Sequence, residues 1–126
     1  MEGLTPAKLR YLLTISELSE QNKSAVRCID VAVRLGVARA SVCRMLSSFV
    51  RDGLLIQDPR RGVHLSESGR AYAEKYGASY HALYDFFKER FGLSDFDAGE
   101  CAMSLLSSLS GTLIATICER IAECQP

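Results

Sequence analysis

The chain has 126 residues, of which 48% are hydrophobic and 24% are charged, and its formal net charge is zero. This length suffices for one ordinary domain or two small ones, and no apolar run approaches the ~18 residues of a membrane span. The N-terminus lacks the charged and apolar segments of an export signal, so we expect a cytoplasmic protein whose five cysteines are reduced thiols.

The charge is unevenly distributed along the chain. Residues 1–62 contain ten Lys and Arg against six Asp and Glu, whereas residues 63–126 contain five against nine. The first half is therefore suited to a polyanion such as DNA, and the second half is not.

The first predicted element is a helix that is capped by Thr5 and begins at Pro6. Its apolar residues indicate that it continues towards Ser19. A polar break is expected at residues 21–24, and residues 25–27 could add a short strand beside a later hairpin.

Two further helices are predicted on either side of a tight turn at Gly36. We expect the first of them to span residues 29–35 and to pack through Ile29, Ala32, Val33 and Leu35. The second spans residues 41–50, and its apolar residues recur at steps of three and four, which marks a buried helical face. That face consists of Val42, Met45, Leu46, Phe49 and Val50.

The other face of this second helix is typical of a recognition helix. Its candidate DNA-binding residues are Arg39, Ala40, Ser41, Cys43, Arg44 and Ser47. The small residues let the backbone approach a groove closely, and the two arginines can reach a guanine edge or a phosphate. An ordinary helical hairpin in an all-α core is the alternative for this stretch alone.

A β-hairpin is predicted directly after these helices. Two short apolar runs within residues 54–65 flank a turn-rich gap at residues 58–62. A hairpin in this place is a wing, and Arg60 and Arg61 at its tip suit contact with phosphates or with a minor groove. A solvated charged turn is the alternative, which the order helix, turn, helix, wing disfavours. We expect His64 to be structural and to have no partner set.

The second half predicts three helices. A long helix over residues 67–91 would measure roughly 37 Å and connect two domains. Ser94 can cap the next helix, with Asp95 and Asp97 in its first turn. After a break at residues 110–111, a last helix over residues 112–124 is expected to bury Leu113, Ile114, Ile117 and Ile121. Two short apolar helices cannot cover themselves against one long helix, so a homodimer is expected.

These elements define a mainly α protein. We predict an N-terminal winged helix-turn-helix DNA-binding domain over residues 1–66 and a helical dimerisation domain over residues 67–126. Such a dimer would contact two half-sites of a duplex operator.

Nearly the whole chain resembles the diphtheria-toxin-repressor and manganese-regulator family, in its short form without an SH3-like domain. The resemblance rests on IDVAVRLGVARASVCRMLSSFVRDGLL, on LSESGRAYAEK and on the stretch HALYDFF…GLSDFDAGEC. It implies a sequence-specific transcriptional repressor that acts as a homodimer. It also implies a divalent transition metal, Fe, Mn or Zn, as cofactor.

The implied metal ligands are only partly present. Four ligand positions of the family correspond to residues that differ from the expected donors, namely Ala7, Arg10, Ser104 and Leu105. His81 and Cys101 match ligand positions, and Asp85 and Asp97 lie at or near the ancillary site. A fixed charge on Arg10 could pair with a carboxylate such as Glu100 in place of a metal; Arg10 pointing to solvent is the alternative.

The remaining candidate ligands form two helical pairs. His81 and Asp85 are four residues apart, as are Asp97 and Cys101, so each pair shares a helix face. If those faces meet, the set offers N, O, O and S donors, which suit Zn²⁺ better than Mn²⁺. The alternative is a His–Asp hydrogen bond, a capping Asp and a buried thiol.

Other functions find less support. No phosphate loop, nucleophile elbow or catalytic cluster indicates an enzyme. A MarR-like regulator that senses a small ligand or thiol oxidation is the main alternative. A protein-interaction winged helix that has lost DNA binding is disfavoured by the four arginines in the predicted DNA-binding set.

Overall fold

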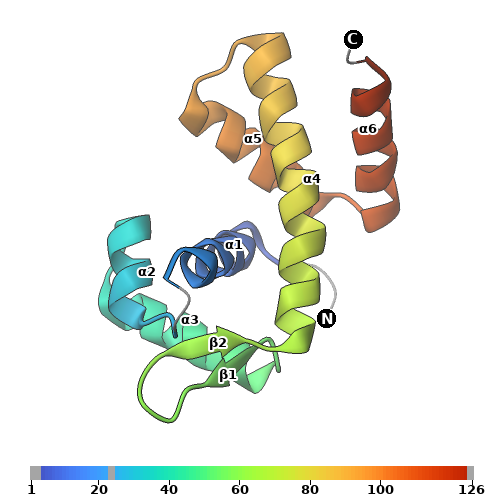
Figure 1. Ribbon diagram of the computed structural model, residues 1–126. Coiled ribbons are helices and arrows are strands. Elements are labelled where there is room, and N and C mark those ends of the chain that lie inside the picture. The colour runs from blue at the N-terminus through green and yellow to red at the C-terminus, as the bar shows by residue number, and fades with distance from the viewer. Residues whose placement is uncertain (1–3, 23–24, 125–126) are drawn as a thin grey trace. The chain divides into compact units, whose positions relative to one another are not determined.

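The computed structural model describes residues 4–22 and 25–124, and these contain the predicted elements in the predicted order (Figure 1). The bounds are α1 Pro6–Asn22, α2 Cys28–Leu35, α3 Arg39–Arg51, β1 Leu55–Gln57, β2 Val63–Leu65, α4 Glu67–Phe91, α5 Asp95–Ser108 and α6 Gly111–Cys124. Thr5 caps α1 as predicted, with its Oγ1 accepting from the N–H of Lys8 at 3.2 Å. The helix continues to Asn22 instead of ending near Ser19, so the first two residues of the predicted polar break are helical; the others lie outside the described residues.

The chain divides into two compact units. One consists of Arg10–Glu74, and the other of the described residues of Met1–Leu9 and Lys75–Pro126. The division falls within α4, after Glu74, because this helix continues without interruption from the end of the wing. The functional boundary at residue 66 stays a prediction.

Arg10–Glu74 contains the helix-turn-helix and the wing. Its fully buried side chains come from α1, from α2, from α3 and from the segments beside the sheet: Leu12, Ile15, Val26, Val31, Val42, Phe49 and Leu54. Burying a side chain as large as Phe49 contributes about 2–3 kcal/mol, and such burial holds α3 in place. Arg34 ties α2 to α1, since its Nη2 donates to Gln21 Oε1 at 2.9 Å and its Nη1 lies 3.8 Å from Glu17 Oε2.

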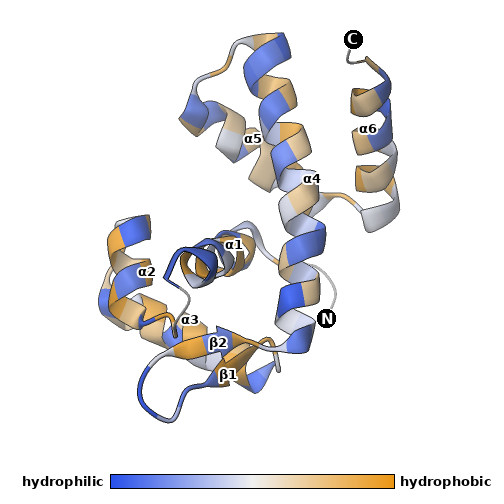
Figure 2. Ribbon diagram, viewed as in Figure 1, coloured by the Kyte–Doolittle hydropathy of each residue, from blue (hydrophilic) through white to orange (hydrophobic). Residues whose placement is uncertain are grey.

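The buried face of α2 differs from the predicted one. Val31 and Ala32 are buried, whereas Ile29 is 44% exposed and Val33 is 75% exposed. Residues 29 and 33 are four apart and share one face, and the neighbouring face through 31, 32 and 35 is the one that packs. The prediction for Ile29 and Val33 was therefore wrong. Figure 2 shows hydrophobic and hydrophilic residues alternating along α2.

The turn after α2 forms as predicted. Gly36 has φ 68 and ψ 37, in the left-handed region, and its N–H donates to Ala32 O at 2.9 Å. The N–H of Val37 donates to the same carbonyl at 3.2 Å. These bonds provide donors for the carbonyl of Ala32 in the last turn of α2, before the chain enters α3.

The wing is an antiparallel pair in which Leu55 faces Leu65 and Gln57 faces Val63. The strand expected over residues 25–27 is reduced to a single bridge, where Val26 and Val63 exchange two backbone hydrogen bonds of 2.9 and 2.8 Å. This bridge fixes the wing, at the end of the strands next to the turn, to the segment before α2.

Ser66 and Gly69 join the wing to α4. The Ser66 hydroxyl donates to Gly53 O at 2.6 Å and accepts from the N–H of Gly69 at 3.0 Å. A Cβ at Gly69 would lie 2.0 Å from Leu54 O, so only glycine lets the first turn of α4 approach this closely.

The second unit packs α4, α5 and α6 around small and aliphatic side chains. The buried ones include Leu83, Ala98, Ala102, Met103, Leu106, Ile114 and Ile121. Leu113 was predicted to be buried but is 45% exposed, because Ile114 and Ile121, seven residues apart, define the packed face of α6. Phe91 and Phe96 are also exposed, at 62% and 72%. None of the described helices has the length and apolar character needed to cross a membrane.

Candidate DNA-binding surface and metal site

The outer face of α3 presents the predicted DNA-binding residues. Arg39, Ala40, Arg44 and Ser47 are exposed, and Ser41 and Cys43 are partly buried. The opposite face is anchored by Val42, Leu46 and Phe49, which are buried. The helix thus holds its polar face outward by burying its other side, as the periodicity predicted.

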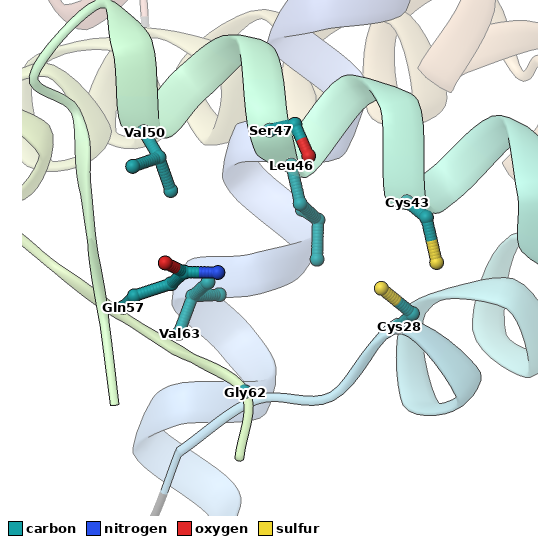
Figure 3. A pocket seen from close by; sticks show the side chains of 8 residues that line it. All are labelled: Cys28, Cys43, Leu46, Ser47, Val50, Gln57, Gly62 and Val63. Carbon is teal, nitrogen blue, oxygen red and sulfur yellow. The ribbon is translucent and has the colours of Figure 1, made fainter. Parts of the chain in front are cut away.

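This outer face borders the wing. Cys43 and Ser47 of α3 and Gln57 and Gly62 of the wing line one open pocket of about 450 Å³ (Figure 3). Because the pocket separates α3 from the hairpin, both elements bound the same hollow of the Arg10–Glu74 unit. A double helix that lay on α3 would find the wing beside it.

A carboxylate organises the wing tip. Asp58 Oδ2 accepts from the backbone N–H of Arg60 at 2.9 Å and of Arg61 at 3.2 Å. The N–H of Asp58 in turn donates to Gly62 O at 2.9 Å. This turn leaves both arginine side chains exposed at the tip, where a phosphate could reach them.

His64 closes the same turn from the opposite strand. Its Nε2 lies 2.8 Å from Asp58 Oδ1, a structural role of the kind predicted for His64, with a partner that the prediction did not include. The His64 hydrogen bond, followed by those from the amides of Arg61 and Arg60, holds the pKa of Asp58 below its ordinary value. The signal for this site was present in the sequence, because Asp before Pro is typical of a turn closed by its own side chain.

The four predicted metal ligands all lie in the second unit. His81 and Asp85 of α4 and Asp97 of α5 are exposed, and Cys101 is partly buried. Within residues 4–22 and 25–124, no three His, Cys, Asp or Glu side chains come together in a way that could hold a metal ion. The two helical pairs therefore do not form one ligand set in this structure, and the role of these four residues as metal ligands stays a prediction.

A different carboxylate joins α4 to α5. Asp95 Oδ1 accepts from Tyr84 Oη at 3.0 Å and pairs with Lys88 Nζ at 2.6 Å. The hydrogen bond from Lys88, and then that from Tyr84, lowers the pKa of Asp95; the same contacts with Asp95 raise the pKa of both partners. Asp97 instead lies in the capped first turn, where its N–H donates to Ser94 Oγ at 3.1 Å. The capping prediction for Ser94 is confirmed.

Comparisons with known proteins agree with this geometry. Residues 3–63 match the family described as iron dependent repressor, N-terminal DNA binding domain. Transcriptional regulator MntR from Escherichia coli is 33% identical over 84 residues, which are 67% of this chain and 53% of the relative. The chain thus spans about half the length of the curated relatives that it matches.

Solved structures share the fold. The metal-dependent transcriptional regulator MtsR aligns with a TM-score of 0.80 and 23% identity over 97% of this chain and 56% of its own. The manganese regulator SloR gives a TM-score of 0.77 and 22% identity over 95% of this chain and 54% of its own. A hypothetical protein from Sulfolobus solfataricus aligns over 95% of this chain and 91% of its own, with a TM-score of 0.69 and 18% identity.

At 18–23% identity the structural matches show the fold alone, and the assignment to a family rests on the sequence matches. The matched segment covers the helix-turn-helix and most of the wing, which include the first of the blocks that carry the resemblance. The chain thus carries an N-terminal DNA-binding domain of the iron-dependent repressor family and is similar in sequence to MntR.

Proposed function

We propose that this protein is a sequence-specific transcriptional repressor that binds duplex DNA as a homodimer in the cytoplasm and is not an enzyme. The observation that carries the proposal is the exposed face of α3 beside the wing, with arginines on both elements. The N-terminal domain of the iron-dependent repressor family supports it. The MarR-like alternative gains no comparable support.

The two elements divide the work of recognition. Arg39 and Arg44 on α3 contact base edges or phosphates, and Ala40, Ser41, Cys43 and Ser47 allow the helix to approach the groove. Arg60 and Arg61 on the wing tip contact phosphates or the minor groove. Base contacts specify the operator, while the wing contributes affinity for any sequence.

Arginine substitutions test this division on a duplex selected from a random library. Arg44→Ala should cost about 1–3 kcal/mol on the selected sequence and relax its specificity. Arg61→Ala should weaken all sequences alike and reduce the slope of log affinity against log salt by about 1.

Arg120→Ala is the matched control, because it removes the same charge from α6, in the other unit. It should leave the affinity and the salt slope unchanged. If neither Arg44→Ala nor Arg61→Ala affects binding to any selected duplex, the DNA surface is wrongly assigned.

The exposed apolar residues of the second unit support the homodimer. Phe91, Phe96 and Leu113 expose between 45% and 72% of their surface, and a partner chain that covers them would remove this apolar surface from water. A twofold partner that covers them would place two recognition helices about 34 Å apart or at a multiple of that. Sedimentation at micromolar concentration tests this, and a monomer would rule the dimer out.

We also propose that DNA binding does not require Mn²⁺ or Fe²⁺. Relatives are described as metal-dependent or manganese-dependent, but here the implied ligand positions hold Ala7, Arg10, Ser104 and Leu105. A guanidinium cannot coordinate a cation, and it carries the positive charge permanently. Arg10 would therefore replace the metal by a fixed charge.

Titration of operator binding with a chelator separates the two cases. Binding should persist in EDTA, and any metal that does bind should involve His81, Asp85, Asp97 and Cys101, so that Cys101→Ser lowers the metal content. If EDTA abolishes binding and Mn²⁺ or Fe²⁺ restores it, metal independence is refuted.

A further inference from the structure

Two cysteine thiols face each other where α2 begins beside α3. Cys28 is the first residue of α2 and Cys43 lies in the second turn of α3. In Figure 3 their sulfur atoms point toward one another across the gap between the helices. The two side chains are close enough to hydrogen bond, both are partly buried, and both are free thiols.

We propose that Cys28 and Cys43 form a reversible disulfide when the protein meets a hydroperoxide, and that this bond weakens DNA binding. The disulfide follows from the placement of the two side chains alone. Its effect on DNA rests on the proposed function, because Cys43 belongs to the predicted DNA-binding face.

Disulfide chemistry suits this pair better than metal binding. Zinc sites need three or four protein ligands, and among the described residues no third His, Cys, Asp or Glu joins the two thiols in a metal-binding group. The other cysteines, Cys101, Cys118 and Cys124, belong to the other unit. Two converging thiols without further ligands are the arrangement that oxidation joins.

A small oxidant can reach the pair from solvent. Cys28 and Cys43 both line the open pocket of about 450 Å³ between α3 and the wing (Figure 3). Leu46, Val50 and Val63 form its apolar side, so water does not fully surround the thiols. The site is thus accessible to a hydroperoxide but partly desolvated.

The order of the steps follows from the protonation of Cys28. Burial, and then the hydrogen bond with Cys43, raise the pKa of Cys28 to about 11, so that Cys28 is a neutral thiol at neutral pH. Because the thiolate and not the thiol attacks an oxidant, Cys28 is poorly suited to the first attack, and we assign that step to Cys43.

The reaction is a balanced two-electron oxidation. The Cys43 thiolate attacks one peroxide oxygen, the O–O bond breaks, and with one proton a water leaves and a sulfenic acid remains. Cys28 then gives up its proton as its sulfur attacks the sulfenic sulfur; the S–S bond forms, the S–O bond breaks, and the hydroxide that leaves takes up this proton to give a second water. In sum, two thiols and one hydrogen peroxide give one disulfide and two waters.

The bond would disturb the DNA-binding face. A disulfide holds its sulfurs about 2.05 Å apart, closer than any nonbonded contact, so the two side chains must rotate toward each other, and we expect α3 to adjust its position relative to the start of α2. Arg39 lies near enough to Cys28 to act on its charge, and Arg44 directly follows Cys43. A shift of α3 therefore moves the arginines that fit a base edge only in a narrow geometry.

Peptide mapping tests the disulfide on the full chain. The protein is treated with hydrogen peroxide, remaining thiols are alkylated under denaturing conditions, and the digest is examined by mass spectrometry before and after dithiothreitol. A linked peptide pair that contains Cys28 and Cys43, with two hydrogens lost and the link removed by the reductant, supports the proposal. Separate alkylation or sulfinic oxidation of the two residues overturns it.

DNA binding is then compared between the oxidised and reduced forms on the selected duplex. Oxidised protein should bind about tenfold more weakly or worse, the loss expected for one displaced arginine contact. Cys124→Ser, which removes an exposed cysteine of the other unit, should keep this response. Cys28→Ser should bind equally well before and after peroxide.

The outcomes separate the two proposals. If the protein with the mapped disulfide binds DNA as tightly as the reduced protein, the proposed regulation is overturned. It is also overturned if peroxide weakens DNA binding by Cys28→Ser as much as binding by the wild type, because oxidation of Cys43 alone is then responsible. If reduced protein binds no selected duplex, the proposed function fails, and the peptide map still decides whether the disulfide exists.

Discussion

A glycine can be required by a left-handed backbone conformation or by the close approach of another group. Three glycines of the Arg10–Glu74 unit allow these two effects to be measured separately. Gly53 has φ 79 and open space around a built Cβ, so Gly53→Ala tests the backbone conformation alone. Gly69 has no positive φ, but a Cβ there would lie 2.0 Å from Leu54 O, so Gly69→Ala tests close approach alone. Gly62 combines φ 92 with a Cβ position 2.6 Å from Val26 O.

The expected losses of unfolding free energy follow from these distances. Gly53→Ala should cost about 1–2 kcal/mol, the penalty of a left-handed alanine. In Gly69→Ala a gain in helix propensity of about 1 kcal/mol opposes a backbone clash, so we expect a net loss of about 2–3 kcal/mol. Gly62→Ala carries both penalties and should lose about 3–5 kcal/mol.

Urea unfolding followed by circular dichroism gives the three values, and thermal midpoints should fall by about 4 °C per kcal/mol. The decisive variant is Gly69→Ala. If it is as stable as the wild type or more stable, α4 does not approach Leu54 as described, and the joint between wing and helix is wrong. If Gly53→Ala loses as much as Gly62→Ala, conformation and not space governs both sites.

Four further substitutions have expected outcomes in other parts of the molecule. Phe49→Ala should lower the unfolding free energy by about 3–5 kcal/mol, because its ring is fully buried. Val33→Ala, at a residue that is 75% exposed, should change the unfolding free energy by less than about 0.5 kcal/mol. If urea titrations give equal losses for Phe49→Ala and Val33→Ala, the described core is wrong. Asp58→Ala should weaken DNA binding by releasing the wing tip. Because folding lowers the pKa of Asp58, the stabilisation of the wing tip by this carboxylate is fully present above the ordinary pKa of 3.8 and is lost as the pH falls through the lowered pKa. Amide exchange at residues 60 and 61 measured against pH checks this, and rapid exchange in the wild type at neutral pH would argue against an ordered tip. Phe96→Ser should raise the dissociation constant of the dimer in sedimentation, and an unchanged constant would place the interface elsewhere.

The order of the elements was predictable because it depends on patterns that are local in the chain. The steps of three and four from Val42 to Phe49 predicted the buried face of α3, and Gly36 and Ser94 marked the ends of helices. Each of these signals acts within one turn or two, so a sequence read residue by residue contains it.

The face of a short helix was not predictable in the same way. In α2 only Asp30 and Arg34 are polar, so two neighbouring faces, one with Ile29 and Val33 and one with Val31 and Ala32, fit the helical period. Only packing against α3 decides between them. The hydrogen bond between Asp58 and His64 was missed for a related reason. It depends on the register of β1 and β2, in which His64 lies opposite Ile56 and therefore close to the turn that contains Asp58.

The candidate metal ligands show the limit of periodicity for a site. Spacing correctly places His81 with Asp85 and Asp97 with Cys101 on their own helices. It does not say which face of α4 meets which face of α5. Here Tyr84, Lys88 and Asp95 make that contact.

The double hydrogen bond of Ser66 limits which residues can begin α4. At most helix starts Ser, Thr, Asp and Asn are interchangeable, since each needs only an oxygen that accepts from a backbone N–H. The hydroxyl of Ser66 must also donate, to the carbonyl of Gly53. Aspartate would place a carboxylate against that carbonyl oxygen and repel it, whereas threonine keeps both bonds. Among the usual capping residues, aspartate is thus excluded here by a carbonyl that lies in the turn after α3 and not in α4 itself.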